Sequence, residues 1–257
     1  MSSVHAASTL ALWAAARVGG RSNDDVLAAV DAAGHRVGVR AASADVAETT
    51  GLPGPGSPTA GSMSLLPLMI NGGIPDLLLP TAGDLRGLPP RGDIAVPALD
   101  AGAVVVFPAL EIGVVPADGQ WRVHSCRSTH PTLTVNEANG EIDGAMADAT
   151  RCLIDLDIAR GSDQVREQVR RIMLAEAVEI PSGTPSAASA LLAKVISLEA
   201  LLVVAAGHET AAVTSRELAV VDDALRPLTL AVRAGRRAAV AQAARALATP
   251  SVSRSRS

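Results

Sequence analysis

The sequence predicts an α+β protein, with helices and a small, mostly antiparallel sheet in the N-terminal half and a helical C-terminal half. Three observations lead to this class. Short apolar runs separated by turn residues occupy 65–125, helical apolar periodicity begins near 136, and two long helices are expected at 186–206 and 214–247, forming an antiparallel hairpin. We expect a sheet-containing half (1–135), a helical half packed on it (136–248, or one continuous domain with it) and a disordered tail (249–257).

The N-terminal segment predicts two helices and a strand. The first helix, 3–18, ends at Gly19-Gly20, and the second, 23–33, is capped by Ser22 or Asn23. Apolar and polar residues then alternate over 35–41, which is typical of a half-buried strand. The Pro/Gly/Ser-rich stretch 50–63 is expected to be a loop.

The sheet is predicted from five short apolar runs. They are 65–70, 76–80, 101–108, 111–116 and 121–125. The Asp118-Gly119 pair between the last two runs predicts a β-hairpin, because both residues tolerate positive φ. The sheet should therefore lie within roughly residues 35–126.

The C-terminal half is expected to be helical because its apolar residues recur at spacings of three and four. One such stripe consists of Ile142, Met146, Ala149, Leu153 and Leu156. A shorter helix follows around 165–172, and "PSGTP" (181–185) interrupts the pattern. Residues 214–217 form a T-x-x-E capping box, and Pro227 predicts a kink or short break in the last helix.

Composition excludes several classes of function. The 257 residues carry a net charge of −4, with 48% hydrophobic and 1% aromatic residues, so no basic field attracts nucleic acid and base stacking is hardly available. Two cysteines do not make a disulfide framework, which favours a cytoplasmic location. The apolar segment 186–207 contains Lys194 and Glu199 near its middle, which favours a core helix over a membrane span.

The densest group of metal-ligating side chains is His124, Cys126 and His130. Imidazole and thiolate bind zinc, but H-x-C-x3-H is not an established zinc spacing, and a Cys126 nucleophile would need a base at hydrogen-bond distance. The ordinary alternative is an exposed histidine beside a half-buried cysteine. No phosphate-binding or dinucleotide motif is present, so no cofactor is expected.

The stretch "PTAGDLRGLPPRGD" (80–93) is a candidate binding loop through Asp84, Arg86, Arg91 and Asp93. Its prolines exclude a phosphate loop, and the favoured interpretation is a stiff connector with a polar tip. A partner or small molecule bound at this loop is the alternative, with His124 and His130 as further contributors.

A second group of candidates consists of arginines in the last helix: Arg226, Arg233, Arg236 and Arg237. They could contact nucleic acid, although positive charge late in a helix also complements the helix dipole. The net negative charge disfavours the nucleic-acid interpretation.

The order of several segments resembles a family of actinobacterial proteins of unknown function. The resemblance rests on "LLLPTAGDLRGLPP", "ALDAGAVVVFP", "GVVP…GQWRV", "DATRCLIDLDIAR" and "VVDDALRPLTLAVRAGRRAAVAQA", and it covers most of residues 60–247. It implies a soluble protein of high-GC Gram-positive bacteria and identifies no catalytic residues.

From the sequence we therefore expect a non-catalytic cytoplasmic regulatory or scaffold protein that acts through protein–protein contacts. The partner would be a protein, a homo-oligomer is a further possibility, and no membrane association is expected. The alternatives are a nucleic-acid-associated protein using the arginine-rich helix and a small-molecule enzyme or binder at the 80–93 loop.

Overall fold

A computed structural model describes residues 2–33, 38–85, 87–89, 92–127, 131–155, 163–207 and 215–249 of the chain, and the side chains of these residues except 152–155, 163–165, 207 and 215–222. The chain divides into two compact units. The first comprises 1–131, 178–185 and 240–257, and the second comprises 132–177 and 186–239. The last helix, α9 (Ser215–Leu247), contributes residues to both units.

The first unit opens with two predicted helices, and Ser22, one of the two candidate caps of the second, was also predicted. Helix α1 (Ser3–Val18) begins where the Ser2 hydroxyl accepts a hydrogen bond from the His5 amide, and α2 (Asn23–Ala32) begins at Ser22 in the same way. Both helices therefore start and end within a residue of their predicted bounds. A third helix, α3 (Ala44–Thr50), was not predicted and ends at Gly51, whose φ is 71°.

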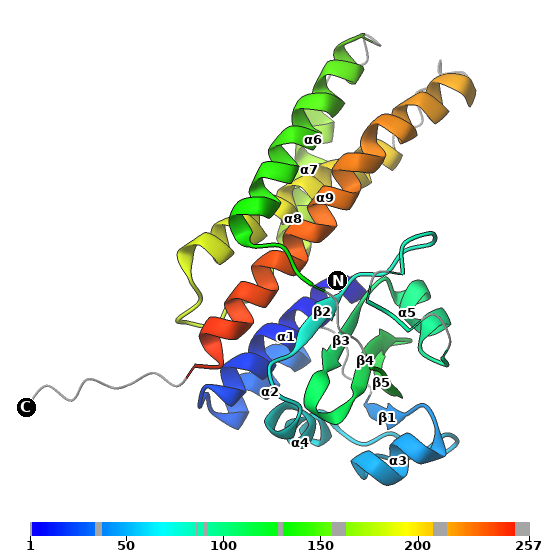
Figure 1. Cartoon of the computed structure of the whole chain (residues 1–257), viewed down its shortest axis with the longest axis vertical. Helices are drawn as coiled ribbons and strands as arrows, with labels where there is room; N and C mark the ends of the chain where they lie inside the picture. Colours follow the sequence, from blue (N-terminus) through cyan, green and yellow to red (C-terminus); the bar gives the residue numbers. More distant parts are fainter. Residues whose placement is uncertain are drawn as a thin grey trace, which may run out of the picture. The chain divides into compact units, whose positions relative to one another are not determined.

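The five strands form one sheet in the order β1-β5-β4-β3-β2 (Figure 1). They are β1 (Val39–Ala41), β2 (Asp76–Leu78), β3 (Val104–Phe107), β4 (Ile112–Ala117) and β5 (Gln120–Ser125). Only β1 runs parallel to its neighbour, and the other pairs are antiparallel. Asp118 and Gly119 both have positive φ at the β4–β5 turn, as predicted for this hairpin. The α+β class with a mostly antiparallel sheet is confirmed.

One strand prediction was wrong. Residues 65–70 form the end of a 3₁₀ turn, η1 (Ser62–Leu65), and the helix α4 (Leu66–Asn71). Pro67 cannot donate to a strand ladder but is tolerated in the first turn of a helix. Leu65, Leu68 and Met69 are buried at helical spacing, whereas Ile70 is half exposed. The apolar run was too short for its period to be recognised.

The sheet is covered on both faces, so all four residues of β3 are buried. Val104 and Val106 pack with Ile94 and Ala98, the latter on α5 (Ala95–Ala101), which the sequence did not predict. Helix α1 contacts β2, β3 and β4, and the short turn η2 (Pro108–Leu110) connects β3 to β4. Residues 178–185 join this unit through Trp13, whose indole nitrogen donates to the Glu179 carbonyl at 3.0 Å.

The second unit contains α6 (Val135–Asp155), α7 (Asp163–Ala175), α8 (Ser186–Gly207) and the first part of α9 (Figure 1). Helix α6 begins with a capping box that the sequence analysis missed: the Thr134 hydroxyl accepts from the Glu137 amide, and the Glu137 carboxylate accepts from the Thr134 amide. The predicted capping box at Thr214 and the tail at 250–257 lie outside the described residues. Of the predicted 142–156 stripe, Ile142 and Ala149 are buried.

Helices α8 and α9 are in close contact and antiparallel, as predicted. Gly235 of α9 lies against Val195 of α8, whereas Leu225, earlier in α9, shares a groove with Ala205, later in α8. Helix α9 is continuous through Pro227, so the short break expected there does not occur.

Candidate functional site

The predicted binding loop, 80–93, is partly described, and of its four candidate residues the structure describes Asp84 and Asp93. Asp84 closes a tight turn with Thr81, each residue's amide donating to the other's carbonyl at 2.9 and 3.0 Å. Arg86 and Arg91 lie outside the described residues. Asp93 approaches His124, with 3.5 Å between a carboxylate oxygen and Nδ1. The sequence analysis named His124 and His130 as further contributors to a site at this loop. Of the possible contacts, the described residues contain the one between Asp93 and His124.

His124 and Cys126 are both buried, which corrects the expectation of an exposed histidine and a half-buried cysteine. His124 lies opposite Gly113 in the β4–β5 pairing. A Cβ added at Gly113 would meet Ile94 and, at 3.0 Å, Cys126, so this glycine lets the loop before α5 pack closely on the sheet. His130 is outside the described residues, and the described part of the chain contains no group of three or more metal-ligating side chains.

Burial lowers the pKa of His124 below 6.5, and Arg122 lowers it further, against the opposing effect of Asp93. The unfolded chain therefore binds more protons than the folded chain at mildly acidic pH. Stability should fall as the pH drops through the unfolded pKa of about 6.5, and the loss should continue until the pH passes the lower folded pKa. Urea unfolding should show a smaller loss for His124→Gln than for the wild type. An equal loss in both would mean that His124 does not contribute to the acid sensitivity.

The buried environment also raises the pKa of the Cys126 thiol to about 11, so little thiolate forms near neutral pH. We expect Cys126 in the native protein to react very slowly with a thiol reagent at about pH 8 and to react rapidly after unfolding. The measurement uses a Cys152→Ser background, so that Cys126 is the only thiol. Rapid labelling of the native protein would show that the Cys126 thiol is accessible, and Cys126 would again be a candidate nucleophile.

The four predicted arginines of α9 do not form one exposed basic face. Arg226 is exposed and pairs with Asp223 at 3.3 Å. Arg236 is buried, with a bidentate pairing to Glu199 of α8. Arg233 and Arg237 are half-buried, and Arg237 lies 3.5 Å from the Thr132 hydroxyl. Arg236 therefore holds two helices together and is not available to a phosphate.

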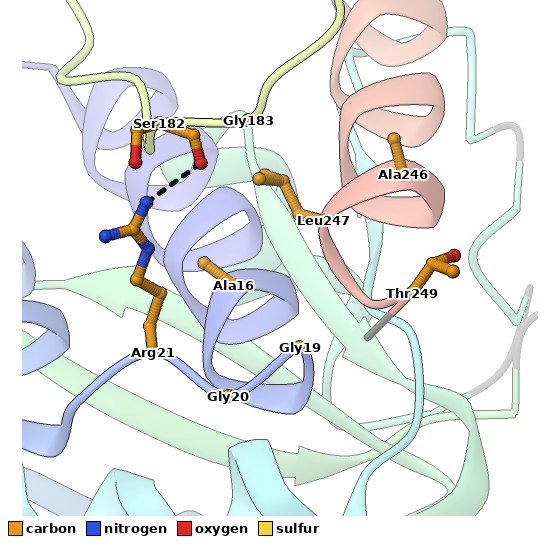
Figure 2. Close-up of a pocket in the computed structure, with 9 residues that line it drawn as sticks. All are labelled: Ala16, Gly19, Gly20, Arg21, Ser182, Gly183, Ala246, Leu247 and Thr249. Atoms are coloured by element: carbon orange, nitrogen blue, oxygen red, sulfur yellow. Dashed lines mark hydrogen bonds between the residues drawn. The ribbon is translucent and has the colours of Figure 1, made fainter. Parts of the chain in front are cut away.

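A polar pocket of about 350 Å³ lies in the first unit where α1 and α9 end (Figure 2). Its walls come from the end of α1 and the turn after it, from the 178–185 segment, and from the end of α9: Ala16, Gly19, Gly20, Arg21, Ser182, Gly183, Ala246, Leu247 and Thr249. Arg21 reaches Ser182 and donates to its carbonyl at 3.0 Å. Among the described residues of this lining Arg21 is the one ionisable side chain, so the described lining offers no acid–base pair.

A second depression, of about 310 Å³, is an apolar groove in the second unit. Helix α6 contributes Met146, Ala149 and Thr150. The other walls come from α8 and α9, chiefly Leu198, Leu201, Leu202, Leu225 and Leu228. Leu198 and Leu228 are buried at its floor, whereas Leu201 is 48% exposed at its rim. We call this the α6–α8–α9 groove.

The sequence analysis recognised the helices of this groove but not the groove itself. Periodicity showed that Met146, Leu225 and Leu228 lie on apolar faces. Which of these faces another helix covers depends on packing between distant segments. The uniform apolarity of α8 was the available indication, because such a helix needs cover on every side.

Comparisons with known proteins match both parts of the chain. Residues 7–136 match the family described as "Rv1486c-like protein, N-terminal domain", and residues 136–237 match its "C-terminal domain". The uncharacterised proteins MT1533 and Rv1486c of two Mycobacterium tuberculosis strains are each 29% identical to the chain, over 90% of its length and 94% of theirs. No solved structure matches significantly. The chain therefore belongs to the Rv1486c-like proteins, a family of unknown function, and the predicted actinobacterial resemblance is confirmed.

Proposed function

We propose that the protein is a non-catalytic cytoplasmic scaffold or regulator that binds another protein chain through the α6–α8–α9 groove. The groove carries this proposal: its floor is buried and leucine-rich, and its rim exposes Leu201 and Met146. Apolar depressions that keep exposed aliphatic side chains on a helical surface are suited to receiving apolar side chains of a partner.

The chemistry of the other candidate residues agrees with a non-catalytic role. Cys126 is held as a thiol, and His124 is buried with a lowered pKa beside one carboxylate. The polar pocket of Figure 2 has one ionisable side chain, Arg21, in its described lining, so that lining offers no acid–base pair. Packing within the chain is enough to explain each of these three features, and none of them requires a bound substrate.

A lipid membrane is the alternative to a protein partner for the apolar surface of α8. Among the described helices, one segment, Ser186–Ala206, is long and apolar enough to cross a bilayer, with a hydropathy of 2.0, and 39% of its 18-residue apolar stretch is buried. Its two charged residues are both paired with other helices: Lys194 with Asp143 at 2.7 Å, and Glu199 with Arg236. These pairings favour a helix that belongs to a bundle in water.

The test compares three baits in affinity capture from the native host: wild type, Leu201→Glu and Leu174→Glu. Leu174 lies on α7, is 71% exposed and is outside the groove, so it is a matched control. A groove partner should be held by the wild type and Leu174→Glu and lost from Leu201→Glu. It should then bind the purified wild type directly in calorimetry. Binding profiles that are identical for all three baits would contradict the proposal.

A further inference from the structure

We propose that residues 92–102, which contain helix α5, are an acid-sensitive cover: protonation of His124 releases this segment from the sheet face on which it packs. We call residues 92–102 the α5 cover, and the structure describes all of them. The inference concerns the first unit and goes beyond the proposed function, because the α6–α8–α9 groove has no part in it.

The α5 cover is attached to the sheet by side chains rather than by backbone hydrogen bonds. Ile94 and Ala98 are fully buried and pack with Val104 and Val106 of β3 and Val115 of β4. Among the described residues, every backbone hydrogen bond of the cover stays within the cover. Because the cover is not part of the strand ladder, it can separate from the sheet while the strands remain paired.

The C-terminal end of the cover borders open space. A hollow of about 220 Å³ lies between α5 and the β4–β5 hairpin, and both Asp100 of α5 and Arg122 of β5 line it. Arg122 pairs with Asp118 of its own hairpin, at 2.6 Å. No ion pair among the described residues therefore fastens this end of the cover to the sheet.

The imidazole of His124 is buried where the cover begins. His124 is 3% exposed, and neither ring nitrogen has a hydrogen-bond partner among the described residues. The Asp93 carboxylate, 3.5 Å from Nδ1, is too far away for a strong hydrogen bond. Opposite His124, Gly113 has no side chain, which lets Ile94 of the cover lie against the strand. A neutral imidazole is tolerated here, whereas an imidazolium would lose its hydration.

The charges that face His124 do not replace this hydration. Asp93 favours the protonated form, but its side chain is 53% exposed, so water screens the attraction. Arg122 opposes protonation, and burial, the largest effect, lowers the pKa of His124. Cys126, further along the same strand face, is held as a neutral thiol by its raised pKa of about 11.

No other carboxylate side chain of the first unit is left out of this balance. Strands β3 and β4 contain no ionisable residue. Asp100 and Asp118 line the hollow, and Glu111, before β4, pairs with Arg127 at 2.7 Å. The side chains of the undescribed residues in this unit are neutral or basic, so they contain no further counter-charge for an imidazolium.

Opening of the cover gives the protonated imidazole access to water. The open form therefore binds a proton more tightly than the closed form, and opening becomes more favourable as the pH falls below about 6.5. Release would uncover Val104 and Val106 of β3, so an apolar surface would become accessible in acid.

Hydrogen exchange of the full chain, read by mass spectrometry of its peptides from about pH 7.5 to about pH 5, tests the proposal. After correction for the intrinsic effect of pH, the opening constant of 92–102 should rise by up to about tenfold per pH unit below about pH 6.5. Peptides from 104–117, in β3 and β4, should keep their protection. The rise should be absent in His124→Gln and retained in His5→Gln, which replaces a buried histidine of α1.

The remaining outcomes overturn the proposal. Exchange of 92–102 that does not depend on pH in the wild type would show that protonation does not release the cover. An equal rise in the 104–117 peptides would show that the first unit unfolds as a whole, and a rise kept in His124→Gln would assign it to another group. If His124→Gln does not fold, titration of the His124 ring by nuclear magnetic resonance in the wild type decides: a folded-state pKa at or above about 6.5 contradicts the proposal.

Discussion

Glu199→Ala is expected to destabilise the protein by about 3 kcal/mol or more, because it removes the carboxylate that pairs with the buried Arg236 guanidinium. The Arg236 side chain is 1% exposed and makes two hydrogen bonds to the Glu199 carboxylate. A buried charge that loses a carboxylate partner keeps its desolvation cost without the attraction that offset it. Urea unfolding of the variant, followed by helical circular dichroism, measures the effect.

Two further variants separate the buried pair from ordinary surface charge effects. Asp148→Ala removes an ion pair whose two side chains are both 72% exposed, and it should cost less than about 1 kcal/mol. Replacing both buried partners, as Glu199→Leu with Arg236→Met, should recover most of the stability lost in Glu199→Ala. If Glu199→Ala is as mild as Asp148→Ala, Arg236 is not held in the buried position described above.

Gly19→Ala should destabilise the first unit by about 3 kcal/mol, because a methyl group there would overlap the backbone carbonyl of Leu247. The φ angle of Gly19 is −75°, which alanine adopts without strain. The expected loss therefore comes from the clash alone. A backbone atom cannot turn aside as a flexible side chain can, so the end of α9 would have to shift. Thermal unfolding and urea titration measure the loss.

The matched control is Gly61→Ala. Gly61 has a φ of −71° and no atom within 4 Å of an added Cβ, so the change should alter stability by less than about 0.5 kcal/mol. Equal stabilities of the Gly19 and Gly61 variants would show that α1 and α9 do not meet as closely as described.

Local rules were sufficient for most of the fold. The Ser22 cap located the start of α2, and the Asp118-Gly119 turn located the β4–β5 hairpin, because these residues act on their immediate neighbours. The run at 65–70 was assigned to a strand because six apolar residues do not define a period. Its helical state is set by Pro67 and by the burial of Leu68 and Met69.

The candidate site was less predictable, because it depends on contacts between distant segments. The sequence indicated that Arg236 belongs to a basic stretch, but its burial depends on Glu199, 37 residues earlier. Likewise, the approach of Asp93 to His124 requires the sheet register that places His124 opposite Gly113. The apolar character of α8 was evident from composition, whereas the groove that it borders became visible only once its neighbours were in place.

Residues 178–185 and 240–247 belong to the first unit. This determines when that unit can complete its folding during synthesis. A ribosome delivers the sheet and α1 long before it delivers the carbonyl of Glu179 that accepts from Trp13, or the end of α9 that lies against Gly19. The first unit therefore cannot complete its packing as an early, independent product of synthesis. A gene fragment that stops at the family boundary, residue 136, would encode the whole sheet but leave the C-terminal end of α1 uncovered.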